Sequence, residues 1–396
     1  MTETFDIQRA RAETRACENL IHFNNAGSSL MPAPVVDYLC NFLKLEESIG
    51  GYESVEREAA ALDNFYHATA RMLNCNAGEV AYAENATRAW DMAFYGLSFN
   101  PGDRILTTIS EYGSNVIAYN QQAERYGVEV VFVPDDQYGQ IDVEALRRMV
   151  DDRVKLISIS LIPTGGGLVN PAMEVGKVAR DAGIPYLLDA CQAVGQLPLD
   201  VEAIGCDMLS ATGRKFLRGP RGTGFLYVRS TMMDRLIPPF LDQHSADLIS
   251  PGEYRMAEDA RRFENWEQYF AGKAALGVSI DYAMDWGLVS IRDRVFFLAE
   301  TLRTRLSEID GVQLTDQGQV KCGIVTFAVA QQDAYQIKSE LHKRKINVSV
   351  SDGSGNLVSF QQRGIEQVVR SSVHYFNTIE EIDIFINALK EILTLN

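Results

Sequence analysis

The stretch Met208–Val228, with the sequence MLSATGRKFLRGPRGTGFLYV, decides the fold of this chain. A short apolar run opens the stretch and another closes it, as expected for two strands joined by a loop. The loop contains a single lysine, Lys215. Upstream, Tyr186–Asp189 reads YLLD, an apolar strand that ends on a carboxylate. We therefore expect Lys215 and Asp189 to lie at one edge of a sheet.

Outward from this stretch, apolar runs alternate with helical patterns from about residue 78 to residue 228. Helical patterns cover 116–126, 142–150 and 174–182, and the apolar runs are Arg104–Ile109, Val128–Val133, Val154–Leu161, Tyr186–Leu188 and Gly224–Val228. Near-continuous apolar strands that alternate with helices indicate an α/β fold whose mainly parallel sheet is covered by helices on both faces. Such sheets bind ligands beyond the carboxyl ends of their strands, where Asp189 and the Lys215 loop are expected.

The pattern predicts three parts of the chain. Residues 1–20 form a polar helical arm, residues 21–255 form the large domain, and residues 256–396 form a smaller C-terminal α+β domain. The alternation breaks at Ser250-Pro251-Gly252, and long helical patterns follow at 273–285, 291–309, 333–344 and 379–395. At 396 residues the chain exceeds the size at which a single hydrophobic core stops growing, so more than one domain is expected.

The charge and composition exclude several classes of partner. A net charge of −16 argues against nucleic acid, which requires clustered basic side chains, and against an anionic membrane surface. A phosphorylated cofactor remains compatible, because it needs only a few local donors. No stretch approaches the roughly 20 apolar residues that cross a bilayer.

The cysteines and histidines give no sign of disulfides or metal. The six cysteines are scattered without a CxxC pair, and the N-terminal stretch lacks the apolar segment of a signal peptide. We therefore expect reduced thiols and a cytoplasmic protein. The five histidines are isolated, without the spacing of zinc ligands, so no metal site is expected.

Lys215 and Asp189 together suggest pyridoxal chemistry. A lysine in a dry pocket beside cations such as Arg214 and Arg218 can lose its proton and attack an aldehyde, although most loop lysines are simply exposed. A buried carboxylate can keep a pyridine nitrogen protonated: opposite charges about 4 Å apart interact by roughly 4 kcal/mol at an effective dielectric of 20. For Asp189 alone, a helix cap or a metal ligand is the alternative, and no second carboxylate or histidine nearby in sequence supports a metal.

The segments Asp189-Ala190-Cys191-Gln192 and Thr212-Gly213-Arg214-Lys215 resemble those of fold-type I pyridoxal phosphate enzymes. More narrowly, they are similar to the class V aminotransferase family, which includes cysteine desulfurases, selenocysteine lyases, isopenicillin N epimerase and related C–S lyases. The resemblance extends from Asn24 to about Asn377. It implies pyridoxal 5'-phosphate as the cofactor, an amino-acid substrate, and a homodimer with active sites near the subunit interface.

The resemblance also implies roles for individual residues. Lys215 would hold the cofactor as a Schiff base and Asp189 would pair with its ring nitrogen, while Gln192 would bond the ring hydroxyl and Tyr112 would stack on the ring. The implied phosphate ligands are Ala86, Thr87, Thr212 and Arg214, of which the first two lie at an expected helix start, a position that suits a dianion. The implied substrate-binding residues are Asn25, Ala26, Gly27 and Arg370, whose guanidinium suits bidentate binding of an α-carboxylate.

Some positions depart from the desulfurase pattern. Arg214 and Tyr112 replace histidines of the desulfurases. Desulfurases carry a sulfur-accepting cysteine on a loop of the small domain, whereas Val348–Val358 here reads VSVSDGSGNLV and contains none. The loop Pro163–Pro171, PTGGGLVNP, resembles that of the lyase and epimerase branch more closely. Persulfide-forming desulfurase activity is therefore disfavoured.

We expect a C–S lyase that catalyses β-elimination from an S-substituted cysteine or its sulfoxide. An amino-acid epimerase or aminotransferase is the alternative, because these reactions share the same proton abstraction. A catalytically silent homologue with a binding role is a further alternative, against which the intact Lys215–Asp189 pair argues. The segment Arg262–Trp266 resembles the one that a second subunit presents to the active site.

Overall fold

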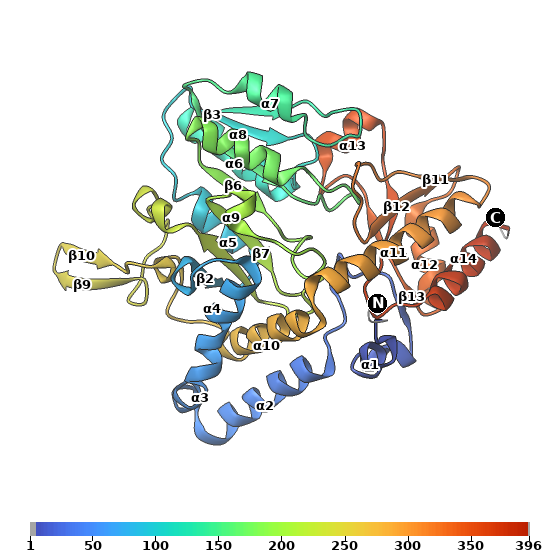
Figure 1. Ribbon diagram of the computed structural model, residues 1–396, viewed down its shortest axis with the longest axis horizontal. Coiled ribbons are helices and arrows are strands. Elements are labelled where there is room, and N and C mark those ends of the chain that lie inside the picture. Colours follow the sequence, from blue (N-terminus) through green and yellow to red (C-terminus); the bar gives the residue numbers. More distant parts are fainter. Residues whose placement is uncertain (1–4, 395–396) are drawn as a thin grey trace.

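The computed structural model describes residues 5–394 (Figure 1). Residues 1–4 of the predicted arm and Leu395 of the predicted last helix lie outside the described residues. The centre of the fold is a seven-stranded sheet with the order β2-β8-β7-β6-β5-β3-β4. Its strands are β2 (Val80–Ala83), β3 (Arg104–Thr108), β4 (Glu129–Val133), β5 (Val154–Ser160), β6 (Tyr186–Asp189), β7 (Met208–Thr212) and β8 (Gly224–Val228).

The sheet is mainly parallel, as predicted. Strands β4, β3, β5, β6 and β7 run parallel to one another. Strand β8 runs antiparallel to both β7 and β2. The chain returns from β7 to β8 through the short loop that contains Lys215, and a connection of this kind joins antiparallel strands.

Both faces of the sheet are buried, which explains the near-continuous apolar runs. Successive side chains of a strand point to opposite faces, so Leu187 and Leu188 belong to different hydrophobic clusters. One face is covered by α5 (Ala86–Phe94) and α6 (Gly113–Tyr126). The other is covered by α4 (Ala59–Leu73), α7 (Val143–Met149), α8 (Ala172–Ala182) and α10 (Phe270–Trp286). The shorter or peripheral helices are α1 (Ile7–Ala12), α2 (Ala33–Ile49), α3 (Gly51–Arg57) and α9 (Val201–Ile204).

Two residues predicted to lie at helix ends do so in the structure. Asp142 caps α7, because its carboxylate accepts hydrogen bonds from the amides of Glu144 and Ala145 at 2.9 Å each. Gly183 ends α8 in the left-handed region, with φ of 67°, a conformation that glycine adopts without steric cost. These ends fix the lengths of the connections that return the chain to the next strand.

The C-terminal part forms a smaller antiparallel sheet with the order β11-β12-β15-β14. Its strands are β11 (Val312–Leu314), β12 (Ile324–Val329), β14 (Ser349–Ser351) and β15 (Val368–Ser372). A separate hydrophobic cluster joins the sheet to its helices. The helices of this part are α11 (Leu288–Ser307), α12 (Ala334–Lys343), α13 (Leu357–Arg363) and α14 (Ile379–Thr394). This arrangement confirms the predicted α/β fold with a smaller α+β part.

The predicted domain boundaries stay a prediction, and two contacts cross them. Strand β1 (Ile21–His22) pairs with β13 (Ile346–Asn347), so the start of the predicted large domain joins the C-terminal part. Helix α10 falls within the predicted range 256–396, yet its residues Leu276 and Ile280 belong to the core beneath the large sheet. Apolar periodicity shows that a helix is amphipathic but does not identify the surface against which it packs.

A hairpin that the sequence did not reveal projects from the body (Figure 1). It consists of β9 (Ala246–Ser250) and β10 (Glu253–Met256), and Gly252 lies at its tip with φ of 137°. Leu248 pairs with Tyr254 across the hairpin, and both side chains are exposed. Within residues 5–394, none of the helices combines the length and apolar character that crossing a bilayer requires.

Candidate active site

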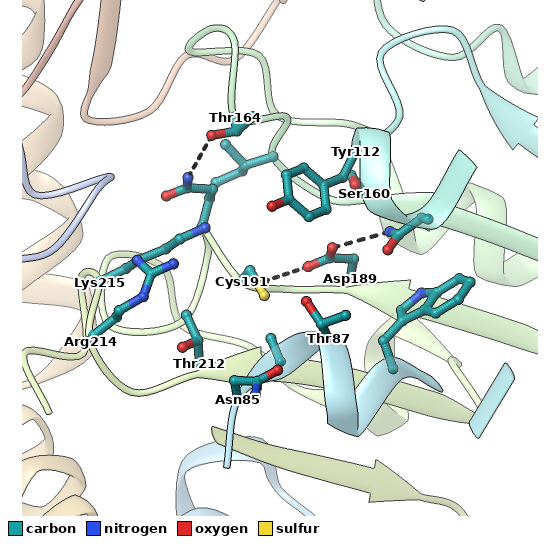
Figure 2. A pocket seen from close by; sticks show the side chains of 15 residues that line it. Asn85, Thr87, Tyr112, Ser160, Thr164, Asp189, Cys191, Thr212, Arg214 and Lys215 are labelled. Atoms are coloured by element: carbon teal, nitrogen blue, oxygen red, sulfur yellow. Dashed lines mark hydrogen bonds between the residues drawn. The ribbon is translucent and has the colours of Figure 1, made fainter. Parts of the chain in front are cut away.

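A cavity opens at the edge of the large sheet where parallel strands end (Figure 2). Ser160 at the end of β5 pairs with Asp189 at the end of β6, and Asp189 pairs with Ser210 of β7. The residues that line the cavity are Asn85, Ala86, Thr87, Trp90, Tyr112, Asn115, Ser160, Ile162, Thr164, Asp189, Cys191, Gln192, Thr212, Arg214 and Lys215. The fold thus brings together every residue predicted for cofactor binding.

Lys215 enters the cavity from the loop between β7 and β8 (Figure 2). The loop is fixed by hydrogen bonds from Gly219 N to Gly213 O (2.7 Å) and from Arg218 N to Lys215 O (2.9 Å). From the C-terminal part, His374 Nε2 donates to Phe216 O at 2.7 Å. Burial lowers the pKa of the Lys215 amine, and the charge of Asp189 partly opposes this shift. A lowered pKa makes the amine a better nucleophile near neutral pH.

Asp189 lies on the far side of the cavity from Lys215 (Figure 2). It is buried, and two donors set the orientation of its carboxylate. Asn115 Nδ2 donates to Oδ2 at 3.2 Å, and the amide of Cys191 donates to Oδ1 at 2.9 Å. A carboxylate has about four lone-pair positions, so Asp189 can also accept a bond from a ligand in the cavity.

The start of α5 lines the cavity and is suited to bind an anion. Asn85 caps the helix by accepting a hydrogen bond from Arg88 N at 2.9 Å. The first amides of a helix have no acceptor within it, so those of Ala86 and Thr87 are left to bind a ligand. Strand β8 approaches closely here: a Cβ at Gly224 would lie 2.6 Å from Ala211 O and 3.0 Å from the carbonyl carbon of Asn85.

Two arginines lie in or beside the cavity, and no acid among residues 5–394 forms an ion pair with either of them. Arg214 donates to the carbonyl of Gly27. Arg370 on β15 is buried, and its Nη1 donates to Thr164 at 2.7 Å (Oγ1) and 3.0 Å (carbonyl oxygen). Its Nε has no partner among residues 5–394. Burial, together with the charge of Arg214, lowers the pKa of Arg370 to about 10. The site therefore holds uncompensated positive charge suited to anionic groups.

The predicted substrate residues at the start of the chain lie beside the cavity without lining it. The side chain of Asn25 is fully engaged: its Nδ2 donates to Ser372 O at 2.7 Å and to His22 O at 3.2 Å, and its Oδ1 accepts from Ser29. The carbonyl of Ala26 accepts from Gln192 Nε2 at 3.1 Å. Their predicted role in substrate binding stays a prediction; in this structure they hold Gln192 and Arg214 in place.

Several lining residues were not among the predicted site residues. Ser160 could have been found, because it follows an apolar run that must end at the same edge as Asp189. Thr164 lies in the quoted loop Pro163–Pro171, but its partner Arg370 lies 206 residues later in the chain. The sequence alone therefore does not predict this contact. Asn115 lies one helical turn from Tyr112 and points the same way. Apart from their apolar character, nothing in the sequence indicates that Trp90 and Ile162 line the site.

Together, the fold and the site define a class of protein: an α/β enzyme with a lysine, an acid and an anion-binding helix start at the carboxyl edge of its sheet. The chain matches the class V aminotransferase family over residues 21–385, and it belongs to that family. Its cofactor is pyridoxal 5'-phosphate, as predicted. The site fits this group, because the free amides of α5, the basic side chains and the Asp189 carboxylate match its phosphate and its ring nitrogen.

Individual relatives agree with this assignment. The chain is 29% identical to a probable cysteine desulfurase of Methanothermobacter thermautotrophicus, covering 94% of each chain. The apo structure of a cysteine desulfurase from Thermococcus onnurineus shares the fold with a TM-score of 0.93, 24% identity and full coverage of both chains. A cystine C–S lyase in complex with its reaction product cysteine persulfide superposes with a TM-score of 0.86 and 21% identity, covering 96% of this chain and 99% of that one.

Proposed function

We propose that this protein is a carbon–sulfur lyase that catalyses β-elimination from an S-substituted cysteine or its sulfoxide. The observation that carries the amino-acid part of the proposal is the buried Arg370, a cation without an acid partner among the described residues and with an unused Nε. An α-carboxylate would accept two parallel hydrogen bonds from such a guanidinium. Thr164 holds Arg370 in place at the edge of the cavity.

Each cofactor-binding residue has a role that its position supports. When bound, pyridoxal phosphate withdraws electrons from the α-carbon of an amino acid. The amides of Ala86 and Thr87, the Thr212 hydroxyl and Arg214 would hold the phosphate. Asp189 would hold the proton on the ring nitrogen, Gln192 would bond the ring hydroxyl, and Tyr112 would cover the ring. Lys215 would tether the cofactor and would accept the α-proton of the substrate on Nζ.

The thiol arrangement favours release of the sulfur group over its capture by the protein. Among the residues that the structure describes, Cys191 is the only cysteine that lines the cavity, and burial raises the pKa of its thiol well above the usual range. The nucleophilic form of cysteine is the thiolate, so Cys191 is poorly suited to accept sulfur. The loop of 352–356, which contains no cysteine, is bonded to the segment before α6: Gly113 N donates to Gly355 O at 2.9 Å and Asn356 Nδ2 donates to Ser110 O at 2.7 Å.

The elimination balances without an oxidant. The proton on Cα would move to Lys215 Nζ, the Cβ–S bond would break, and the electron pair of that bond would leave with sulfur, as a thiolate from a thioether or as a sulfenate from a sulfoxide. The released aminoacrylate takes up water to give pyruvate and ammonia. Similarity to proteins named cysteine desulfurase and cystine C–S lyase supports cleavage of this bond.

We also propose a cytoplasmic homodimer. The segment that leads to Trp266 exposes Ile237, Phe240, Leu248 and Tyr254, and Trp266 itself is half exposed. Clustered exposed apolar side chains commonly mark a protein interface. All six cysteines are free, as in a reducing compartment.

Replacement of the lysine tests the cofactor assignment. Lys215→Ala should abolish the visible absorption band of the lysine-bound cofactor and reduce turnover by several orders of magnitude, because both the tether and the proton acceptor are lost. Lys177→Ala, at an exposed position on α8, is the matched control and should retain both. An unchanged band in Lys215→Ala would show that another amine holds the cofactor.

Product analysis tests the reaction. The wild-type protein, incubated with a panel of S-substituted cysteines and their sulfoxides, should release pyruvate, ammonia and the sulfur product in equal amounts. Keto acid that appears only when an amino acceptor is added would identify an aminotransferase, and loss of optical purity without keto acid would identify an epimerase. Absence of any reaction and of cofactor absorbance would indicate a silent homologue.

A further inference from the structure

Glu111 is a buried carboxylate behind the cavity that the roles assigned above leave unused. It lies between β3 and α6 and is 2% exposed. Its Oε1 accepts hydrogen bonds from Ser160 Oγ (2.5 Å), Tyr112 N (2.9 Å) and Asn115 Nδ2 (2.9 Å). Its Oε2 accepts from Ser160 N (2.8 Å), Thr107 Oγ1 (3.2 Å) and Thr108 Oγ1 (3.4 Å). Amide donors reach both oxygens, an arrangement that suits the ionised form.

Asn115 connects this carboxylate to Asp189. The same Nδ2 donates to Glu111 Oε1 at 2.9 Å and to Asp189 Oδ2 at 3.2 Å, so its two hydrogens bridge two acids. Asn115 is 4% exposed, and its position on the first turn of α6 leaves it little freedom. The orientation of the amide, and through it the orientation of the Asp189 carboxylate, therefore depends on Glu111.

Glu111 Oε1 also supports the side of the cavity on which Tyr112 lies. Through the amide of Tyr112, Oε1 sets the start of α6, from which the Tyr112 ring projects over the cavity. Glu111 also holds the end of β5 beside Asp189, because its Oε1 accepts from Ser160 Oγ and its Oε2 accepts from Ser160 N. Glu111 thus contacts backbone and side-chain groups that hold both Tyr112 and Asp189 in place.

The surroundings of Glu111 disfavour its charged form. Burial raises the pKa of Glu111, the hydrogen bond from Ser160 lowers it, and the nearby charge of Asp189 raises it further. The other titratable groups that face it are Tyr119 on α6 and Tyr186 on β6. A buried acid next to a second acid is unfavourable for stability alone, which points to a role in the site.

We propose that Glu111 is a positioning residue for the cofactor ring: through Asn115 it orients Asp189 toward the ring nitrogen, and through the Tyr112 amide it sets the plane of the covering side chain. This inference rests on the proposed role of Asp189 as the partner of the ring nitrogen. It concerns how the ring is held, not which substrate reacts.

The variant Glu111→Gln tests the proposal by keeping the size of the side chain and removing its charge. We expect the dissociation constant for pyridoxal phosphate, measured by titration of the apoprotein, to rise by about tenfold or more, as is typical when the partner that orients a ligating side chain is lost. The visible circular dichroism of the bound cofactor should also change, because it reports the orientation of the ring.

Tyr119→Phe is the matched control. Tyr119 is fully buried on the same helix, and its hydroxyl donates to Ser158 Oγ at 2.8 Å without reaching Asp189. It should lower the melting temperature while leaving the cofactor dissociation constant within twofold of wild type. A Glu111→Gln protein that matches Tyr119→Phe in both affinity and dichroism would overturn the proposal.

A second variant covers the case in which Glu111→Gln does not fold. Asn115→Leu removes the bridge to Asp189 and leaves the other bonds of Glu111 intact, so we expect the same loss of cofactor affinity. Unchanged affinity in Asn115→Leu would also overturn the proposal. Failure of the proposed function is distinct, because it would appear in the wild-type protein as a missing lysine-dependent band or as other products.

Discussion

At the scale of the residue, Arg370 gives the site its preference for an anion. A buried guanidinium normally has a carboxylate partner, but Arg370 is held by the hydroxyl and carbonyl of Thr164. Neutral acceptors fix its position without neutralising its charge. Burial, and after it the charge of Arg214, lowers the pKa of Arg370 to about 10, so the group stays protonated near neutral pH. An incoming carboxylate would therefore supply the missing partner.

Arg370→Gln should raise the KM for the amino-acid substrate by about 30- to 150-fold, because a hydrogen bond to a charged group contributes roughly 2–3 kcal/mol. The absorption band of the cofactor should persist. Steady-state kinetics with the best substrate of the panel provide the measurement.

Arg294→Gln is the control for loss of an arginine. Arg294 is half-buried and donates to the carbonyls of Tyr375 and Asn377, away from the residues that line the cavity. Its KM should stay close to that of wild type. An Arg370→Gln enzyme with an unchanged KM would show that another group binds the carboxylate.

At the scale of the element, the alternation of strands and helices along the large domain follows from the sequence, because the central strands β6, β7 and β8 are buried on both faces. The α5 start could also be predicted as an anion site. The packing of β8 against this helix start could not be predicted, because Gly224 and Asn85 are 139 residues apart in the sequence (224 − 85). Glycine is required here because the atoms that a Cβ would meet belong to backbone.

Gly224→Ala should weaken cofactor binding by about tenfold and destabilise the fold by roughly 1–3 kcal/mol, the usual range for overpacking. A Cβ 2.6 Å from Ala211 O cannot be accommodated without a shift of β7 or of the start of α5. Cofactor titration and thermal denaturation measure the two effects.

Gly51→Ala is the comparison, since a Cβ at Gly51 would meet no atom within 4 Å. It lies at the start of α3, and alanine is favoured over glycine in a helix. Its stability should be equal to or above that of wild type. Equal behaviour of the two alanine variants would contradict the packing argument.

At the scale of the whole molecule, the sequence predicted the two-part architecture and the cofactor, while the arrangement between parts was beyond it. Arg370 and Thr164 were both visible in the sequence, but only pairing of β15 within the small sheet brings them together. The same limit applies to Asn25, whose substrate role stays a prediction and whose amide donates to Ser372 O, a contact between residues 347 positions apart. The β9–β10 hairpin was not predicted, because its strands are too short to show a clear alternation of apolar and polar residues.

The hairpin makes the dimer testable. Leu248 is 74% exposed, and burying a leucine contributes about 1.5–3 kcal/mol, twice over in a symmetric dimer. Leu248→Asp should therefore raise the dimer dissociation constant by at least about tenfold, as measured by sedimentation.

Ile384→Asp, at an exposed apolar position on α14, serves as the control and should sediment as wild type. A wild-type protein that is monomeric at micromolar concentration would refute the dimer, and an unaffected Leu248→Asp dimer would exclude the hairpin from its interface.

The bridge between Asn24 and Ser372 has a consequence for any attempt to divide the protein into fragments. It couples two segments that are 348 residues apart (372 − 24), and Ser372 ends the strand that carries Arg370. A fragment without residues 21–29 would keep every residue that lines the cavity. It would lose the backbone neighbour of Ser372 and the carbonyl groups that hold Gln192 and Arg214.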